Sequence, residues 1–167
     1  MKLRIGSRKS PLAAWQAHFI ADRLRALGCE IEFVWITTEG DLSADQSVPL
    51  TASAGVGVFT KAIQRSLLNG DCDIAVHSLK DLPTQPVEGL SVAATTERED
   101  VRDCLLSSKF SSFETLPTGA TLGTGSPRRL AQLHRLRPDL VCQAIRGNVD
   151  TRIRKMESGE YDAIVLA

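Results

Sequence analysis

The sequence predicts an α/β protein with mainly parallel sheets, and three observations carry this prediction. Short apolar runs rich in β-branched residues alternate with segments whose apolar residues recur at helical spacing. A polar, charged break at residues 95–100 divides these elements into two series. Each series contains a Ser-Pro step after a predicted strand, at Ser10-Pro11 and at Ser126-Pro127, which is typical of a helix start. We therefore expect two similar domains, each with an anion-binding edge where a strand meets a helix.

The first series opens with a strand at residues 2–6, followed by a helix that Ser10 caps and Gly28 ends. The apolar residues that recur at helical spacing in this helix are Leu12, Trp15, Phe19, Ile20, Leu24 and Leu27. The next elements are expected to be a strand at 30–37, a loop at 38–57, a helix at 58–68 and strands at 73–76 and 90–94. The loop is long, polar and rich in small residues, which is typical of a functional lid or a disordered segment.

The second series repeats this alternation after the break. One helix is predicted to begin at Ser126-Pro127 and to stop before Pro138, and Asn148 is the predicted cap of another. The strands of this series are expected at residues 103–107, 120–123, 140–145 and 162–166.

Lys80 and Asp81 follow the predicted buried strand at 73–76, and ligands in open α/β sheets lie outside the carboxyl ends of strands. This pair is therefore a candidate site, although a surface ion pair explains this segment alone more simply. Residues 123–129 (GTGSPRR) place two arginines at a helix start without forming a Walker A or G-x-G-x-x-G loop. Such a helix N-terminus is expected to hold an anion, with an ordinary turn as the alternative.

Formal charge sums to zero over the 167 residues but is unevenly distributed. Residues 1–100 carry 10 basic and 13 acidic side chains, and residues 101–167 carry 10 basic and 7 acidic ones. Most cations between Arg128 and Lys155 are arginines, which bind carboxylate or phosphate bidentately. Arg135 and Arg154 are expected to be solvated surface. Nucleic-acid binding is disfavoured because no aromatic residues are interleaved with these cations.

Four cysteines lie far apart without Cys-x-x-Cys spacing, which argues against a zinc or dithiol site and favours buried free thiols. The histidines have no metal-ligand spacing, so we expect no metal site. His18 and His134 are read as structural, and His77 as a residue that orients its neighbours. The N-terminus resembles a strand rather than a signal peptide, and no apolar run approaches the ~20 residues of a membrane span. We therefore expect a cytoplasmic protein.

Five blocks of the sequence, in register over nearly the whole chain, resemble the porphobilinogen deaminase (hydroxymethylbilane synthase) family. They are residues 5–13 (IGSRKSPLA), 77–83 (HSLKDLP), 125–129 (GSPRR), 146–152 (RGNVDTR) and 161–164 (YDAI). The resemblance implies two hinged domains of the type II periplasmic-binding-protein kind with the site in the cleft. We place the first domain at 1–96, the hinge at 97–102 and the second domain at 103–167.

The resemblance also implies an activity: the stepwise condensation of four porphobilinogen molecules into hydroxymethylbilane, with loss of ammonia, in porphyrin and heme biosynthesis. A covalent dipyrromethane primes the chain in this family, whose members are usually monomers, and no nucleic-acid or membrane partner is implied. Asp81 corresponds to the catalytic carboxylate. The residues implied to bind the acetate and propionate groups or to line the cleft are Arg8, Ser10, Gln16, Phe59, Ser78, Lys80, Thr124, Ser126, Arg128, Arg129, Arg146, Asn148 and Arg152.

Two departures qualify the resemblance. Val56 stands where the family usually has a lysine, so one cation of the cleft is missing. The family's third domain, which holds the cysteine that bears dipyrromethane, has no counterpart here, so we expect an N-terminal portion that is inactive alone. The alternative is a non-catalytic small-anion binding protein of the same fold, which would not require the pair Lys80 and Asp81.

Overall fold

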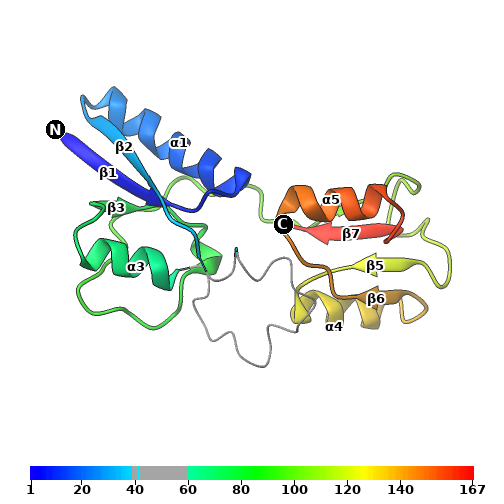
Figure 1. Cartoon of the computed structure of the whole chain (residues 1–167). Coiled ribbons are helices and arrows are strands. Elements are labelled where there is room, and N and C mark those ends of the chain that lie inside the picture. The colour runs from blue at the N-terminus through cyan, green and yellow to red at the C-terminus, as the bar shows by residue number, and fades with distance from the viewer. Residues whose placement is uncertain (39–40, 42–59) are drawn as a thin grey trace. The chain divides into compact units, whose positions relative to one another are not determined.

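The computed structural model describes residues 1–38, 41 and 60–167 (Figure 1). The chain divides into two compact units, unit 1 (Met1–Thr95) and unit 2 (Thr96–Ala167). Each unit contains one sheet with helices packed on it, and most strand pairs are parallel. The predicted α/β class with mainly parallel sheets is thereby confirmed. A hinge at 97–102 remains a prediction.

Unit 1 is built around a three-stranded parallel sheet with the order β2-β1-β3. Ile5, on the central strand, is completely buried. The elements in chain order are β1 (Lys2–Ser7), α1 (Pro11–Ala26), β2 (Glu30–Trp35), α3 (Lys61–Leu68), β3 (Ile74–Ala75) and the 3-10 turn η2 (Leu79–Asp81). Because β1 and β3 are parallel neighbours, the segments that follow them leave the sheet at the same edge.

The apolar stripe predicted for α1 is only partly buried. Ile20 and Leu24 pack on the core of unit 1, but Trp15 keeps 57% of its surface exposed and Leu27 keeps 80%. Two alanines, absent from the predicted stripe, are the fully buried residues of this helix: Ala17 and Ala21. Small side chains at the contact let the helix lie close to the sheet, which displaces the larger ones toward its flanks.

The strand predicted at 73–76 is shorter and less buried than expected. Only Ile74–Ala75 are strand, and both are half-buried. Pairing with β1 nevertheless continues on either side, because Asp73 N donates to Arg4 O (2.9 Å) and Val76 N donates to Gly6 O (3.1 Å). The strand predicted at residues 90–94 is wrong: this backbone is irregular, and it pairs with no strand in the part of the chain that the structure describes.

The helix predicted at 58–68 is present as α3, which begins after the N-cap Thr60 and buries Ile63. Phe59, a predicted site residue, and Val56 lie outside the described residues. The same holds for most of the loop predicted at 38–57, of which Thr38 and Asp41 are described.

Unit 2 contains a four-stranded sheet with the order β4-β7-β5-β6, in which β4 runs antiparallel to β7 and the other pairs are parallel. Alternate residues of β7 face opposite sides of this sheet. Ala163 and Val165 join the cluster against which Leu133 of α4 packs, whereas Ile164 and Leu166 join the cluster that contains Met156 of α5. The two helices therefore cover opposite faces (Figure 1). The bounds are β4 (Cys104–Leu106), β5 (Thr121–Gly123), α4 (Pro127–Leu136), β6 (Val141–Gln143), α5 (Val149–Glu157) and β7 (Ala163–Leu166).

The cysteines only partly match the expectation of buried thiols. Cys72 is buried, and a Cβ on Gly6 would come within 2.7 Å of its Sγ, so the glycine makes room for it. Cys29 and Cys142 are half-buried, and burial raises the pKa of Cys142. The expectation is wrong for Cys104, which is exposed although it lies on a strand, because β4 is at the edge of its sheet.

Of the histidines read as structural, His18 packs against the ring of Phe33, with ring centroids 4.5 Å apart, whereas His134 is exposed on α4. None of the helices that the structure describes is both long and apolar enough to cross a membrane.

Candidate functional site

Unit 1 brings predicted site residues from three segments to one edge of its sheet. Arg8 follows β1, Ser10 occupies the N-cap position of α1, and Gln16 lies one and a half turns into that helix. Ser78, Lys80 and Asp81 follow β3, the parallel neighbour of β1. Together with Leu12, Ala13, Val76 and His77, these six residues line a cavity of about 60 Å³.

A direct hydrogen bond fixes two walls of this cavity relative to each other. The side-chain amide of Gln16 lies 2.9 Å from Ser78 Oγ, which ties α1 to the segment after β3. The hydroxyl of Ser10 makes no capping hydrogen bond within the described structure, although Ser10 occupies the N-cap position as predicted. Its hydroxyl therefore remains a polar group of the cavity wall.

Arg8 is paired with Asp41, a residue that the sequence reasoning missed. Arg8 Nε lies 3.0 Å from Asp41 Oδ1, and the carboxylate also accepts from the backbone N–H and the hydroxyl of Thr38. Asp41 N in turn lies 3.3 Å from Thr38 Oγ1, so the two residues form a reciprocal capping box. Burial raises the pKa of Asp41, but the hydrogen bonds from Arg8 and Thr38 outweigh it, and the net pKa is lowered. The Thr-x-x-Asp spacing was the available signal.

Lys80 and Asp81 lie on the 3-10 turn η2, where Asp81 N donates to Ser78 O over 2.9 Å. Lys80 is exposed and Asp81 is half-buried. His77, in the same cavity wall, has its pKa lowered by burial, which the negative charge of Asp81 only partly offsets. The role of orienting its neighbours, which the sequence suggested for His77, remains a prediction.

Unit 2 assembles a second group of predicted residues at the start of α4. The Ser126 hydroxyl accepts from Arg129 N (3.4 Å), so it caps the helix, and Ser126 N donates to Thr124 Oγ1 (3.3 Å). Thr124 is buried, whereas Arg128 points from the helix start into solvent. At this edge the Ser126 hydroxyl is therefore occupied by the helix cap, whereas the Arg128 cation is exposed to solvent.

Arg152 reaches this edge from α5. Its Nε donates to Gly147 O over 2.7 Å, and its guanidinium lies beside Gly125, where an added Cβ would be 3.6 Å from Nη1. Burial, and next the positive charge of Arg129, lower the pKa of Arg152. Asn148 is the N-cap residue of α5 by position, without a side-chain capping bond among the described residues, and Arg146 is half-buried just before it.

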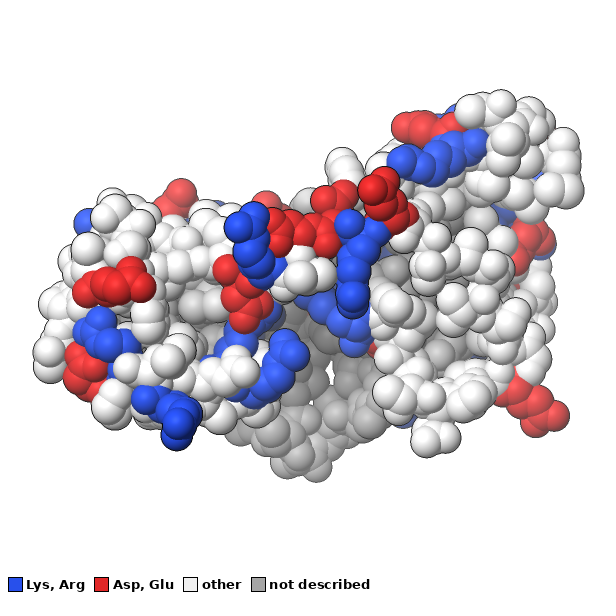
Figure 2. Space-filling model, turned by 180° about the vertical axis from the view of Figure 1, so that it is seen from behind, with Lys and Arg blue, Asp and Glu red and all other residues white. Residues whose placement is uncertain are grey.

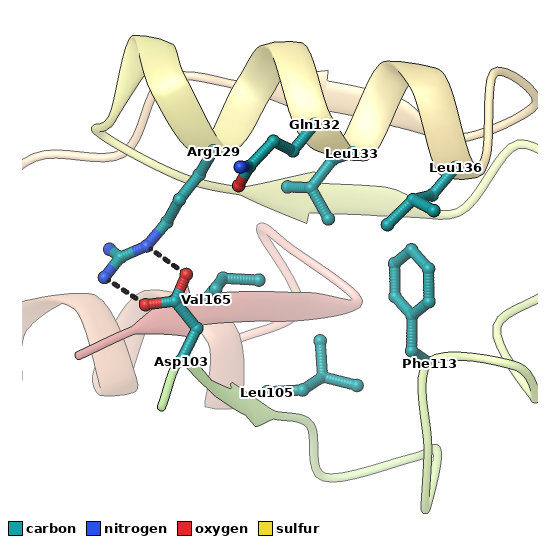
Figure 3. A pocket seen from close by; sticks show the side chains of 8 residues that line it. All are labelled: Asp103, Leu105, Phe113, Arg129, Gln132, Leu133, Leu136 and Val165. Atoms are coloured by element: carbon teal, nitrogen blue, oxygen red, sulfur yellow. Dashed lines mark hydrogen bonds and ion pairs between the residues drawn. The ribbon is translucent and has the colours of Figure 1, made fainter. Parts of the chain in front are cut away.

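Arg129 is held by Asp103, a second carboxylate whose role the sequence reasoning missed. Arg129 Nε lies 2.9 Å from Asp103 Oδ2, and Nη2 lies 2.6 Å from Oδ1. The pair borders a pocket of about 260 Å³ whose other lining residues are mostly apolar (Figure 3). No spacing rule could have linked the two residues, because they are 26 positions apart and meet only through the sheet.

The cations of residues 128–155 do not form one basic surface. Arg137 is structural: it pairs with Asp139 and donates to Phe113 O and Leu116 O. Arg135 and Arg154 are exposed, as expected for solvated surface. Basic and acidic side chains are interspersed on the face shown in Figure 2. The described residues include no group of three or more His, Cys, Asp or Glu side chains that could hold a metal.

Comparison with solved structures finds solute-binding proteins. An ancestral cationic amino acid solute-binding protein matches with a TM-score of 0.47 and 17% identity, over 99% of this chain and 69% of its own. Substrate-binding domain 2 of Lactococcus lactis GlnP, in an open conformation, matches with a TM-score of 0.49 and 13% identity, over 99% and 67%. Likenesses at this level do not bear on function. The family model described as porphobilinogen deaminase, dipyromethane cofactor binding domain, matches residues 3–167.

Proposed function

Because this chain belongs to the porphobilinogen deaminase family, we propose that it carries the substrate-binding and catalytic groups of a hydroxymethylbilane synthase. This transferase condenses four porphobilinogen molecules, with loss of ammonia, into a linear tetrapyrrole for porphyrin and heme synthesis. Porphobilinogen and the growing pyrrole chain are its proposed partners, and we place it in the cytoplasm as a monomer.

The observation that carries this proposal is the cavity of unit 1, where Asp81 lies among the cations Arg8 and Lys80. Porphobilinogen carries two carboxylates, a pyrrole N–H and a cationic aminomethyl group. Arginine and lysine suit the carboxylates, and a lone carboxylate suits the N–H and the positive charge. A site for a simple anion would need the cations but not Asp81.

The proposed reaction at Asp81 has two parts. In the first, the C–N bond of the aminomethyl group breaks and ammonia leaves with the electron pair, so positive charge spreads over the pyrrole. Asp81 stabilises that charge while its oxygens accept from the pyrrole N–H. In the second, the terminal α-carbon of the growing chain bonds to the methylene carbon, and that α-carbon then loses its proton, which Asp81 can accept.

The family's dipyrromethane cofactor fits the donor set described above. Its acetate and propionate groups require cations, for which Arg128, Arg129, Arg146 and Arg152 at the strand edge of unit 2 are the proposed partners. When bound, it supplies the pyrrole α-carbon to which the first substrate is joined. Ser126, Thr124 and Asn148 are proposed to line this edge of unit 2, and Ser10, Gln16 and Ser78 are proposed to line the separate cavity of unit 1.

The proposal is tested in two ways. Binding of porphobilinogen to this chain is measured by calorimetry. Ammonia release from porphobilinogen is measured with this chain joined to the family's third domain, which is called the full protein below. We expect binding, and ammonia release with formation of a linear tetrapyrrole detectable by mass. Arg25→Gln, on the exposed face of α1, is the matched control for Arg8→Gln: the first should bind normally and the second weakly. Binding of dicarboxylates as tight as that of porphobilinogen, without ammonia release, would instead identify an anion-binding protein.

A further inference from the structure

Arg129 is held in one orientation by a neighbouring carboxylate. Its Nε and Nη2 face the two oxygens of Asp103 at 2.9 and 2.6 Å, which is the bidentate, side-on arrangement. The Arg129 side chain is only 12% exposed, whereas that of Asp103 is 41% exposed. The arginine is therefore the enclosed partner, and the carboxylate approaches it from the more open side.

The rest of the guanidinium is directed away from the pocket. In Figure 3 the third nitrogen of Arg129 carries no dashed line and points away from Leu133 and Leu136. The backbone of Arg129 is fixed as well, because its N–H donates to the Ser126 hydroxyl. Side-on pairing with Asp103 thus leaves the Nη1 end of the fork for another carboxylate.

A second cation near Arg129 favours this arrangement. Arg129 is close enough to Arg152 for its charge to lower the pKa of that half-buried arginine. Two such cations repel each other, and an adjacent carboxylate offsets part of the repulsion. Without it, Arg129 would be free to turn toward solvent, and its rotamers would have to be ordered anew on each binding event.

We propose that Asp103 is a positioning residue for the reaction: it locks Arg129 side-on, so that the free end of the guanidinium is presented to a substrate carboxylate. This inference rests on the proposed function, because the ligand is porphobilinogen or the growing pyrrole chain. The opposite role, in which Asp103 competes with substrate for Arg129, predicts tighter binding when the carboxylate is removed.

The test uses two readouts and a control pair from the same segment. Asp100, three positions before Asp103, makes a bidentate pair with Arg102, and both side chains are largely exposed. Asp100→Asn therefore removes a similar carboxylate–arginine contact that has no role in the proposed site. The first readout is the Arg129 Nε–H signal in ¹⁵N NMR spectra. Asp103→Asn should move it to the position of a solvated arginine, and Asp100→Asn should leave it in place.

The second readout is porphobilinogen affinity by calorimetry. Asp103→Asn should weaken binding about two- to tenfold, the factor expected for ordering one long side chain on binding. Asp103→Asn should add nothing in an Arg129→Gln background, and Asp103→Glu should restore part of the affinity.

An unmoved Nε–H signal overturns the proposal whatever the ligand. Unchanged or tighter porphobilinogen binding by Asp103→Asn overturns it as well. If the unmodified protein does not bind porphobilinogen, the proposed function fails first, and the substrate role of Asp103 fails with it.

Discussion

Two helices of this protein begin with the same dipeptide, yet their caps differ. Ser126 uses its hydroxyl to accept from Arg129 N, as a helix N-cap normally does. Ser10 occupies the equivalent position before Pro11 without such a bond in the described structure, and it lines the cavity of unit 1 instead. A capping hydroxyl is committed to the fold, whereas one that does not cap is available to a ligand. The same motif thus serves stability in one unit and is free to serve binding in the other.

The arginines near these caps follow a common rule. Arg8 and Arg129 are each held side-on by a carboxylate that is distant in sequence, Asp41 or Asp103. In unit 1 this carboxylate belongs to a capping box with Thr38, whereas in unit 2 it directly precedes β4. The orientation of one arginine is therefore fixed at each sheet edge, although the carboxylate that fixes it is positioned differently in the two units.

The largest effect is expected at Asp81, the carboxylate proposed for catalysis in unit 1. Asp81→Asn should leave the fold intact and lower porphobilinogen turnover by about 100-fold or more, the scale of lost acid–base catalysis. Ammonia release by the full protein measures turnover, and circular dichroism checks the fold. Asp71→Asn, an exposed residue just before β3, is the control. Near-normal turnover of Asp81→Asn would remove the catalytic assignment.

A second test asks whether the arginines of unit 2 bind as forks. Arg129→Lys and Arg146→Lys keep the charge but lose bidentate geometry, so chain growth should stall and partly elongated complexes should accumulate. Native mass spectrometry of the full protein during turnover would detect them. Arg135→Lys, exposed on the same helix as Arg129, should elongate normally. If all three variants elongate normally, Arg129 and Arg146 do not bind substrate carboxylates bidentately.

The caps themselves give the sharpest contrast. Ser126→Ala should lower the free energy of unfolding of unit 2 by about 1 kcal/mol, because it removes a formed cap. Ser10→Ala should change stability much less and should weaken porphobilinogen binding instead. Urea unfolding and calorimetry on both variants separate the two effects. Equal losses of stability would show that Ser10 caps its helix in solution.

The smallest expected effect concerns pH. The folded pKa of Asp41 lies below its usual value of 3.8, so its ionisation stabilises the fold above that pH. This contribution is lost as pH falls from about 4 through the folded pKa. Asp41→Asn should therefore be less stable than the unmodified protein at pH 6, and the difference should shrink toward pH 3. Urea midpoints across this range measure it, and a constant difference would argue against the pairing with Arg8.

Much of the fold was predictable because local signals agreed with one another. Apolar runs marked most strands, and the Ser-Pro steps placed the starts of α1 and α4 correctly. The strand predicted at 90–94 failed because an apolar run indicates a strand only if another strand lies beside it. The stripe of α1 was misread for a related reason: Ala17 and Ala21 are buried because of what faces them, not because they are strongly apolar.

The candidate site was predictable as a set of residues but not as a set of contacts. Six predicted residues line one cavity in unit 1, because the carboxyl ends of β1 and β3 meet. The carboxylates that hold Arg8 and Arg129 could not be assigned, since their pairing depends on tertiary placement over 33 and 26 positions. The positions of Phe59 and Val56 remain predictions.

The position of β7 affects the order in which the chain can fold. β1, β2 and β3 of unit 1 are complete by residue 75, but β4 must wait for β7, its only partner among the described strands. About 60 residues separate Cys104 from Leu166, which at ~5–20 residues per second of synthesis is roughly 3 to 12 seconds. During that interval β4 and one side of β5 present unpaired edges to other chains. We therefore expect the second half of this protein to depend more on chaperones during synthesis than the first.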